Sequence, residues 1–344
     1  MYGLFFYITP LIGFILTFII MPYLIRYMNS INKNGPDVFK IDSPIIPESG
    51  GIGFIIIFIF LLIIGTIASP TIVVQQRLLM TTIIITLVTI IGLIDDFKGL
   101  SAKIKPLLLI IIALPILIFQ IGTPKPVLPL IGPTQLTIFY WFLALFVIAI
   151  PANASNMLDV MNGVMSGSGI MILLTAFITS FIIPIDGRII TDDSIYYLRF
   201  VSLTMISVLT AFWLFNRYPA KIFAGDTGSL GVGATIGLVA IFGQIEFVMV
   251  VALLLHIMNS FSIISSLKGL RERKEIHDRP VSVKDGIITA SKNPAAPITL
   301  VRLLVASSSK TEKTVIKQIY SLVAYCCILA ILTAFLIRQE LIQL

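Results

Sequence analysis

Ten long apolar runs limit what this chain can fold into. The hydrocarbon core of a bilayer is about 30 Å thick, so a helix needs about 20 mostly apolar residues to cross it. The runs cover residues 3–25, 51–69, 77–94, 106–122, 135–151, 165–184, 197–215, 228–244, 246–267 and 318–337. The sequence therefore predicts an all-α polytopic membrane protein of about ten transmembrane helices, with residues 1–344 forming a single integral membrane domain.

The composition agrees with this class and excludes several others. Hydrophobic residues make up 57% of the chain and charged residues 12%, which is far from the balance of a soluble domain. The two cysteines, Cys326 and Cys327, are adjacent inside an apolar run, so neither a disulfide framework nor a thiolate metal site is expected. The first run lacks a basic flank and a small-residue cleavage site, so we expect a first transmembrane helix and not a cleaved signal peptide.

The basic residues are divided unequally between the two sides of the predicted bundle. Of 24 Lys and Arg residues, nineteen lie in the odd-numbered loops, eleven of these from Lys268 to Lys317, and five lie on the opposite side. Cytoplasmic loops carry the excess of Lys and Arg, so the odd loops are predicted to be cytoplasmic and both termini external. The net charge of +7 then reflects topology, and nucleic acid is not an expected partner. The ninth loop, residues 268–317, is the one extramembrane piece large enough to have its own structure.

The polar clusters that are too elaborate for simple connectors all lie in these odd loops. In chain order they are Glu48 with Ser49, Asp95 and Asp96 followed by Lys105, the Asn-rich residues 151–163, the segment Gly225-Asp226-Thr227-Gly228-Ser229, and His277-Asp278-Arg279. Carboxylate and amide oxygens with almost no Cys or His favour a hard cation such as Mg²⁺. Lysine, arginine and histidine are natural partners of a diphosphate. The inventory predicts a metal-bridged phosphoryl-transfer site at the cytoplasmic face.

Each cluster also has a simpler structural interpretation. Asp95 and Asp96 could be a solvated helix end paired with Lys98. The Asn-rich loop could be turn chemistry, and residues 225–229 could be only a loop and a helix N-cap. The basic residues of the ninth loop could anchor to anionic headgroups.

A transporter is the main alternative from another functional class, because ten helices also suit one. Transporters usually bind their substrate near the midplane of the bilayer. The polar residues expected near the midplane of the bilayer are Gln244, His256 and Asn259. Hydrogen bonds between packed helices are sufficient to account for their presence there. The clustering of carboxylates, amides and basic groups at one face favours an enzyme.

The motifs resemble those of the polyprenyl-phosphate N-acetylhexosamine-1-phosphate transferases, of glycosyltransferase 4 type. The resemblance is carried by Ile94-Asp95-Asp96, by Asn153-Ala154-Ser155-Asn156 with Asn162-Gly163, and by Phe215-Asn216 through Gly225-Asp226-Thr227-Gly228-Ser229. It implies a ten-helix enzyme that moves a sugar phosphate from a UDP-sugar to a lipid phosphate and releases UMP. Ile46-Pro47-Glu48-Ser49, Lys105 before Pro106, and residues 297–304 are most similar to the dolichyl-phosphate N-acetylglucosamine-1-phosphate transferases of archaea and eukaryotes.

This resemblance implies a role for individual residues. Asp95 and Asp96 match the essential acidic pair, and Lys105 and Asp226 are the other expected catalytic residues. The metal ligands implied are Asn156 and Asp226, holding Mg²⁺, which Mn²⁺ could replace. The implied substrate-binding residues are Glu48, Asn153, Asn162, Phe223, His277 and Arg279, with Phe223 a stacking partner for uracil. Asp159 is a secondary site candidate, and the sequence Ile276-His277-Asp278-Arg279-Pro280 departs from both branches of the family, which leaves the role of Asp278 open.

The expected substrates are UDP-N-acetylglucosamine and a polyprenyl (dolichyl) phosphate, in the first membrane step of lipid-linked oligosaccharide synthesis. A phospho-N-acetylmuramoyl-pentapeptide transferase or an undecaprenyl-phosphate sugar-1-phosphate transferase is the alternative within the family. The resemblance also implies a cell (plasma) membrane location and a homodimer. We expect the lipid phosphate to attack the sugar-proximal phosphorus directly; a two-step route through an aspartyl-phosphate on Asp95 or Asp96 is the alternative.

Overall fold

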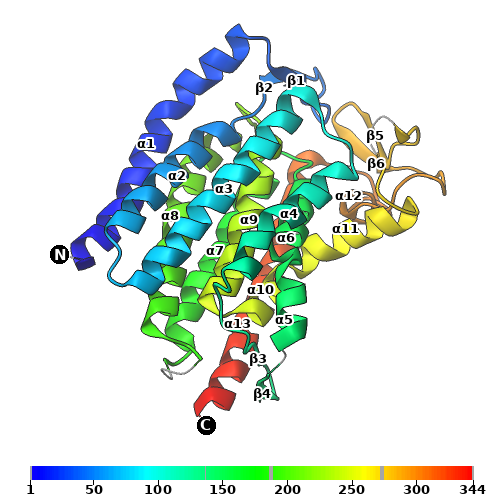
Figure 1. The fold of residues 1–344 in the computed structure, drawn as a ribbon. Coiled ribbons are helices and arrows are strands. Elements are labelled where there is room, and N and C mark those ends of the chain that lie inside the picture. Colours follow the sequence, from blue (N-terminus) through cyan, green and yellow to red (C-terminus); the bar gives the residue numbers. More distant parts are fainter. Residues whose placement is uncertain (1, 136, 186–188, 272–274, 343–344) are drawn as a thin grey trace.

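The computed structural model describes residues 2–135, 137–185, 189–271 and 275–342, which form a bundle of long helices with short strands at its ends (Figure 1). Its helices are α1 (Tyr2–Ser30), α2 (Gly51–Ile67), α3 (Ile72–Lys98), α4 (Ile104–Ile118), α5 (Thr137–Ala144), α6 (Phe146–Leu158), α7 (Val164–Ile182), α8 (Asp192–Asn216), α9 (Gly225–Gly243), α10 (Glu246–Ala252), α11 (Leu254–Ser266), α12 (Leu300–Leu304) and α13 (Glu312–Ile342). Its strands are β1 (Asn34–Pro36), β2 (Ile45–Pro47), β3 (Val127–Leu128), β4 (Gly132–Pro133), β5 (Val281–Lys284), β6 (Ile287–Ala290) and β7 (Lys310–Thr311).

Each apolar run of the sequence coincides with a helix or with two consecutive helices. Within the described ranges, seven helices are long and apolar enough to cross a membrane, counting α5 with α6 as one, or eight if α10 and α11 form one bent span. Helices α2 and α4, of 17 and 15 residues, are shorter apolar helices. Helical structure follows from the composition because a backbone in hydrocarbon must satisfy its hydrogen bonds internally. The prediction of a mostly helical, multi-pass membrane protein is confirmed.

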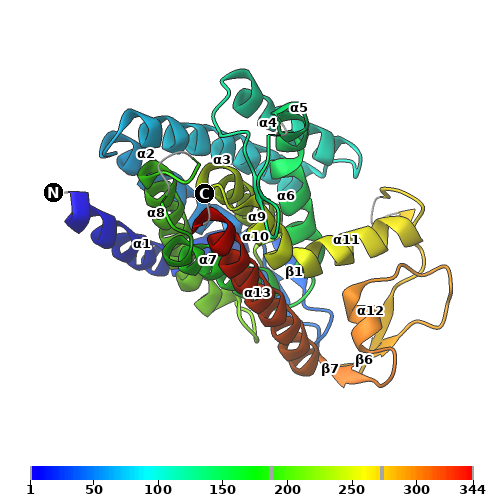
Figure 2. The same ribbon diagram turned by 90° about the horizontal axis from the view of Figure 1, so that it is seen from below.

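Helix α9 lies at the centre of the bundle and is enclosed by its neighbours in the view from below (Figure 2). In its most apolar window, 89% of the residues are buried, against 28% for α1. Glycines make this packing possible: a Cβ on Gly237 would lie 1.8 Å from the carbonyl oxygen of Val147, and one on Gly92 would lie 2.5 Å from the Cα of Thr227. Small residues on facing helix surfaces allow this close approach of backbones.

The strands lie beyond the helix ends. Strands β1 and β2 form an antiparallel hairpin in the connection between α1 and α2, with Gly35 opposite Ile46. Strands β5, β6 and β7 form a small antiparallel sheet beside α12, in the segment that follows α11. Helix α11 leaves the bundle after a 64° bend from α10 and runs beneath this sheet (Figure 1). The last helix, α13, begins at Glu312, before the expected start at residue 318.

Both ends of the chain lie on the same side of the bundle, opposite β1 and β2 (Figure 1). The opposite side therefore collects the C-terminal end of α3, the C-terminal end of α6 and the N-terminal end of α9. These are the helix ends that carry the Asp95, Asn156 and Asp226 motifs. The fold brings together motifs that are up to 131 residues apart in the sequence.

Candidate active site

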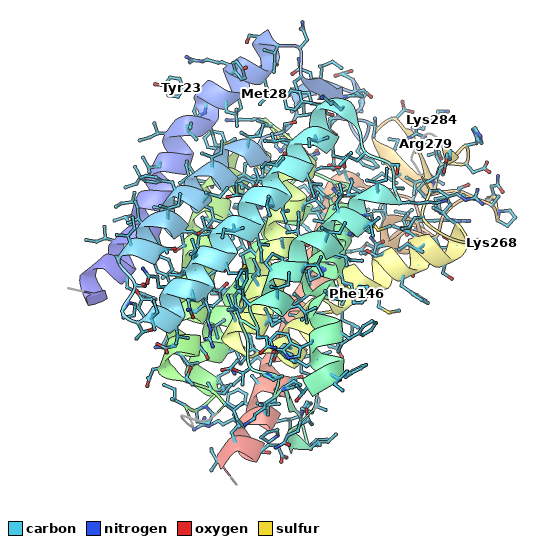
Figure 3. The ribbon with its side chains drawn as sticks, viewed as in Figure 1. Tyr23, Met28, Phe146, Lys268, Arg279 and Lys284 are labelled. Carbon is cyan, nitrogen blue, oxygen red and sulfur yellow. The ribbon has the colours of Figure 1, made fainter. Side chains whose placement is uncertain are left out.

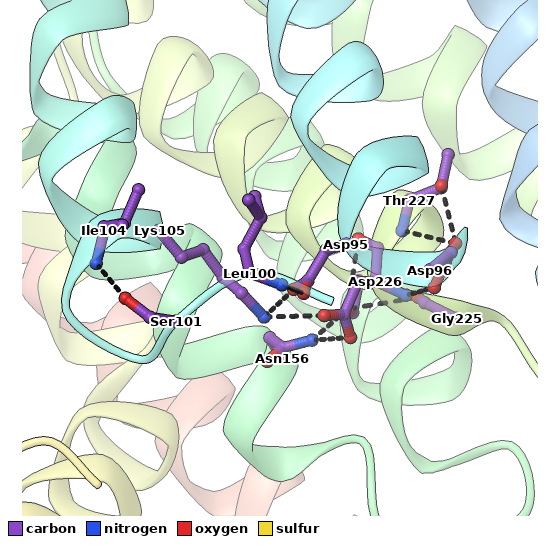
Figure 4. Close-up of polar contacts among 11 residues, drawn as sticks. Asp95, Asp96, Leu100, Ser101, Ile104, Lys105, Asn156, Gly225, Asp226 and Thr227 are labelled. Carbon is purple, nitrogen blue, oxygen red and sulfur yellow. Dashed lines mark hydrogen bonds and ion pairs between the residues drawn. The ribbon is translucent and has the colours of Figure 1, made fainter. Parts of the chain in front are cut away.

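An ion-pair cluster joins the ends of three helices (Figure 4). The Nζ atom of Lys105, at the start of α4, contacts the carboxylates of both Asp95 and Asp226, and its distance to Asp226 Oδ2 is 2.6 Å. Asp95 also accepts a hydrogen bond from the backbone N–H of Leu100, at 2.6 Å. The side chains of Asp95 and Lys105 are 7% and 14% exposed, whereas that of Asp226 is 30% exposed. Asp226 is therefore the member of the cluster that is most open to a ligand.

Asp96 has a different function from its neighbour: it caps the N-terminus of α9. Its Oδ1 atom accepts from the backbone N–H of Asp226 at 2.7 Å. Its Oδ2 atom accepts from the backbone N–H and the hydroxyl of Thr227, at 3.2 and 2.7 Å. The carboxylate satisfies backbone groups that a helix start leaves unpaired, and its charge is favourable at the positive end of the helix dipole. Asp96 thus fixes the position of Asp226 from another helix.

The glycine before Asp226 is required by this arrangement. Gly225 has a φ of +72°, and a Cβ at this position would lie 2.7 Å from Asp96 Oδ1. Only glycine adopts this backbone conformation readily and leaves room for the carboxylate. The glycine is therefore part of the cap.

Asn156 completes the cluster from the last turn of α6. Its side-chain amide donates to Asp226 Oδ1 at 2.7 Å and to the hydroxyl of Ser229 at 2.8 Å. Asp226 is thus held by Lys105, by Asn156 and, through its own backbone, by Asp96. The structure brings together the five residues expected at the acidic, lysine and metal positions, namely Asp95, Asp96, Lys105, Asn156 and Asp226.

A second group of expected site residues lies where the β2 strand meets the start of α9. The backbone N–H of Phe223 donates to the carbonyl of Pro47, and the N–H of Gly50 donates to the carbonyl of Phe223, both at 2.8 Å. These bonds place Phe223 beside the segment that carries Glu48. The Glu48 carboxylate is 3.3 Å from Lys33 Nζ. Glu48 and Phe223 therefore adjoin the cluster through the start of α9.

The structure gives Asn162 and Asn153 structural contacts. Asn162 donates from Nδ2 to Asp37 and Glu312, and its Oδ1 accepts from the backbone N–H of Ala220 at 2.7 Å. Its side chain is buried and its polar atoms are engaged within the protein. Asn153 donates to the carbonyl of Ala149, one turn earlier in α6, at 2.7 Å. Within the described ranges, neither side chain forms a hydrogen bond with a residue of the Asp226 cluster.

The ninth-loop residues are placed apart from the cluster. His277 and Arg279 are exposed; Arg279 lies just before β5, near Lys284 at the end of that strand, and Lys268 follows the end of α11 (Figure 3). Asp278 accepts a hydrogen bond from Asn293 Nδ2 at 2.7 Å, so it stabilises its own loop. Among the residues that the structure describes, no hydrogen bond or ion pair joins His277 or Arg279 to Asp226, whose partners are Lys105, Asn156 and Asp96.

Asp159 faces the cluster from the turn after α6. Burial raises the pKa of the Asp159 carboxyl to about 7, and the negative charges of Asp226 and Asp96 act in the same direction. A cation at the cluster would favour the charged form of this carboxyl. Asp159 is therefore sensitive to what the cluster binds.

The simpler interpretations of these motifs are only partly correct. Asp95 forms its ion pair with Lys105, while Lys98 is exposed at the end of α3. Residues 225–229 do begin a helix, but the capping carboxylate comes from Asp96 on α3. His256 contacts Ser168, and Asn259 contacts the backbone of Met157 and Leu300, so these polar residues join packed elements as expected.

The donor set of the cluster fits a hard cation that is shared with a substrate. Asp226 and Asn156 carry carboxylate and amide oxygens, the ligand types that Mg²⁺ prefers. Asn156 directs its Nδ2 atom toward Asp226 and Ser229, so binding a cation through its Oδ1 atom would require the amide to turn over. Within the described ranges no group of three or more His, Cys, Asp or Glu side chains is arranged to hold a metal ion. Mg²⁺ is usually held by one or two carboxylates together with water and substrate phosphates, so the cluster suits a metal that arrives with a phosphate ligand.

The fold and the cluster together define a class: a multi-pass membrane protein with a charged polar centre at the ends of its helices. The sequence profile of Glycosyl transferase family 4 matches residues 78–244, from α3 through α9. A protein of Saccharolobus solfataricus, assigned the name UDP-N-acetylglucosamine–dolichyl-phosphate N-acetylglucosaminephosphotransferase, is 33% identical over 239 residues, covering 68% of this chain and 70% of that protein. This chain belongs to Glycosyl transferase family 4.

Two further relatives show both branches of the family. A protein of Sulfolobus acidocaldarius with the same assigned name is 29% identical over 243 residues, covering 69% of this chain and 70% of that protein. A phospho-N-acetylmuramoyl-pentapeptide-transferase of Prochlorococcus marinus is 28% identical over 242 residues, covering 67% of this chain and 63% of that protein. The resemblance inferred from the motifs is confirmed.

Proposed function

We propose that this protein transfers N-acetylglucosamine 1-phosphate from UDP-N-acetylglucosamine to a polyprenyl phosphate of dolichyl type, with release of UMP. The observation that carries the proposal is the convergence of Lys105, Asp226 and Asn156 at the ends of apolar helices. A water-soluble nucleotide and a membrane-bound lipid phosphate can meet only at such a boundary. The names of the two archaeal relatives support this choice of sugar and lipid over the pentapeptide-transferase alternative.

The residues of the cluster suit a single displacement. An oxygen of the lipid phosphate forms a bond to the sugar-proximal phosphorus, the bond from that phosphorus to the UMP oxygen breaks, and UMP leaves with the electron pair. Lys105 neutralises negative charge on the diphosphate, and Asp95 holds the ammonium in place. Mg²⁺, held by Asp226 and Asn156, would supply further charge neutralisation when bound. Both Asp95 and Asp96 are engaged in other contacts, which favours this route over an aspartyl-phosphate intermediate.

The membrane arrangement is part of the proposal. We place ten crossings in the cell membrane, and the excess of Lys and Arg in the odd loops supports an orientation with the cluster cytoplasmic and both termini external. Helices α2 and α4 and the bent pair α10–α11 would complete the ten crossings. Residues 268–317 would then form the large cytoplasmic loop of a single membrane domain, and the active protein would be a homodimer.

Release of UMP tests the function directly. Purified protein in detergent is given UDP-N-acetylglucosamine, Mg²⁺ and either dolichyl or undecaprenyl phosphate, and UMP is measured. We expect turnover that requires the lipid and stops when EDTA removes the metal. Asp226→Ala should abolish turnover, whereas Asp285→Ala, in the exposed turn between β5 and β6, should leave it unchanged. Normal turnover by Asp226→Ala would refute the proposed site.

A panel of UDP-sugars separates the alternatives within the family. Turnover with UDP-N-acetylmuramoyl-pentapeptide and not with UDP-N-acetylglucosamine would assign the protein to the other branch. Absence of UMP release with every donor, together with uptake of a solute into proteoliposomes, would favour the transporter.

A further inference from the structure

Two residues of the last helix, neither of them part of the cluster, contact the turn between α6 and α7. Glu312 is the first residue of α13, and Tyr320 lies about two turns further along the same helix. Both contacts end on consecutive residues of this turn, Asn162 and Gly163. The turn, residues 159–163, connects directly to Asn156 at the end of α6.

Glu312 makes the first contact through a buried carboxylate that is 2% exposed. Its Oε1 atom accepts from Asn162 Nδ2 at 2.5 Å and from the Asn162 backbone N–H at 3.3 Å. Its Oε2 atom forms an ion pair with Lys40, which is also 3.2 Å from Asp37 Oδ2 and lies 4.0 Å from the centre of the Tyr218 ring. One carboxylate oxygen of Glu312 therefore accepts from Asn162, and the other pairs with Lys40.

Tyr320 makes the second contact. Its hydroxyl donates to the carbonyl of Gly163 at 2.6 Å and accepts from Trp213 Nε1 at 3.2 Å. Gly163 has a φ of +74°, and a Cβ on Gly167, one turn into α7, would lie 2.3 Å from the Tyr320 hydroxyl. The hydroxyl is therefore fitted closely against the end of the turn.

Two connections, each made of hydrogen bonds and a short stretch of backbone, join α13 to the cluster. Asn162 Oδ1 accepts from the backbone of Ala220, in the segment that runs into Gly225 and Asp226. The same turn continues from Asn156, which donates to Asp226 Oδ1. Both connections end at Asn156 and Asp226, the residues that in the proposed function would hold the Mg²⁺ that accompanies the donor diphosphate.

We propose that Glu312 and Tyr320 are positioning residues for the nucleotide-diphosphate side of the site, with Glu312 acting through Asn162. The inference rests on the proposed function and adds to it: α13 controls affinity for the UDP-sugar and has little effect on the lipid phosphate. A buried acceptor that is lost leaves its donor unsatisfied, and here that donor belongs to the turn that carries Asn156. The turn then loses its fixed position relative to Asp226.

Steady-state kinetics of Glu312 variants test the inference. In the UMP-release assay, Glu312→Ala should raise the KM for UDP-N-acetylglucosamine about tenfold or more, as expected for loss of a buried charge-assisted hydrogen bond. The KM for the polyprenyl phosphate should stay within about twofold of the wild-type value, since the substitution does not change the contacts that bind this lipid. Glu312→Gln keeps an oxygen acceptor for Asn162 and should restore the nucleotide KM. Lys313→Ala, at the exposed next position of α13, is the matched control.

The outcomes distinguish positioning from a general structural role. An unchanged nucleotide KM in Glu312→Ala, or an equal rise in both KM values, would overturn the inference. An equal rise of the nucleotide KM in Glu312→Ala and Glu312→Gln would also overturn it, because the ion pair with Lys40, and not the hydrogen bond to Asn162, would then be responsible. If Glu312→Ala does not fold, Tyr320→Phe decides, since it removes only a hydroxyl: a raised nucleotide KM supports the inference and an unchanged one refutes it. A wild-type protein without turnover refutes the proposed function itself.

Discussion

Replacing Asp96 by asparagine tests whether this carboxylate is a helix cap or a chemical group. The side chain accepts three hydrogen bonds from the first turn of α9, at 2.7, 3.2 and 2.7 Å. Asparagine has nearly the same shape but only one acceptor oxygen, and its NH₂ group would face an N–H donor. At least one backbone group of Asp226 or Thr227 would lose its partner, and the negative charge at the start of the helix would be removed.

The size of the effect follows from these contacts. Loss of an N-cap costs about 1 kcal/mol and removal of a favourable charge at a partly buried helix N-terminus costs up to about 2 kcal/mol. If this free energy comes from the positioning of Asp226, kcat/KM should fall by a factor of about 5 to 150. A residue that forms the covalent bond to phosphorus would cost far more, about 10⁴-fold or beyond, as removal of a nucleophile does in other enzymes.

The assay is UMP release at several Mg²⁺ concentrations. Asp96→Asn should retain measurable turnover and need more Mg²⁺ for half-maximal activity, because Asp226 is less well placed. Thr227→Val, which removes only the hydroxyl donor, should have a smaller effect of the same kind. Complete loss of turnover in Asp96→Asn, or a phosphorylated wild-type enzyme trapped with UDP-sugar in the absence of lipid, would refute the capping argument.

Two further predictions concern the charges of the cluster. Lys105→Met leaves the carboxylates of Asp95 and Asp226 without their shared ammonium group. Because breaking a buried ion pair costs about 3–5 kcal/mol, kcat/KM for the UDP-sugar should fall at least about 100-fold. Lys98→Met, at the exposed end of α3, is the control, and equal loss in both would contradict the assigned pairing. For Asp159, the folded-state pKa of about 7 lies above the ordinary value of 3.8. Between these two pH values the folded protein therefore binds one more proton than the unfolded chain. Metal-free wild-type protein should accordingly become less stable as the pH rises from about 4 to 7. Asp159→Asn should remove this slope from the melting temperature measured in EDTA, and an unchanged slope would show that Asp159 is not its source.

Much of the fold could be predicted from the sequence because hydropathy sets helix positions in a membrane. The ten apolar runs coincide with helices or helix pairs. The bend between α10 and α11 was not predictable, since the apolar run of residues 246–267 continues through it without glycine or proline. Its geometry depends on tertiary contacts and not on local composition.

The residues of the cluster could be named from motifs, but their pairing could not. Lys98 is nearer in sequence to Asp95 than Lys105 is, yet Lys98 is exposed and Lys105 forms the ion pair. Asp96 follows Asp95 immediately, and only the position of α9 shows that it is a cap. Glu312 carried no signal in the sequence, because its partners Lys40 and Asn162 are 272 and 150 residues away.

The glycine contacts of α9 limit how this protein can move. Backbone atoms of α9 lie against α2 at Gly51, against α3 at Gly92 and against α6 near Val147 and Pro151, with no side chains between them. Side chains can change rotamer to permit sliding, but directly packed backbones cannot. We therefore expect the central helix and its three neighbours to move as a unit, and any closure over a substrate to come from the connecting segments and the sheet beside α12. Variants that slow closure should accordingly be sought outside the bundle.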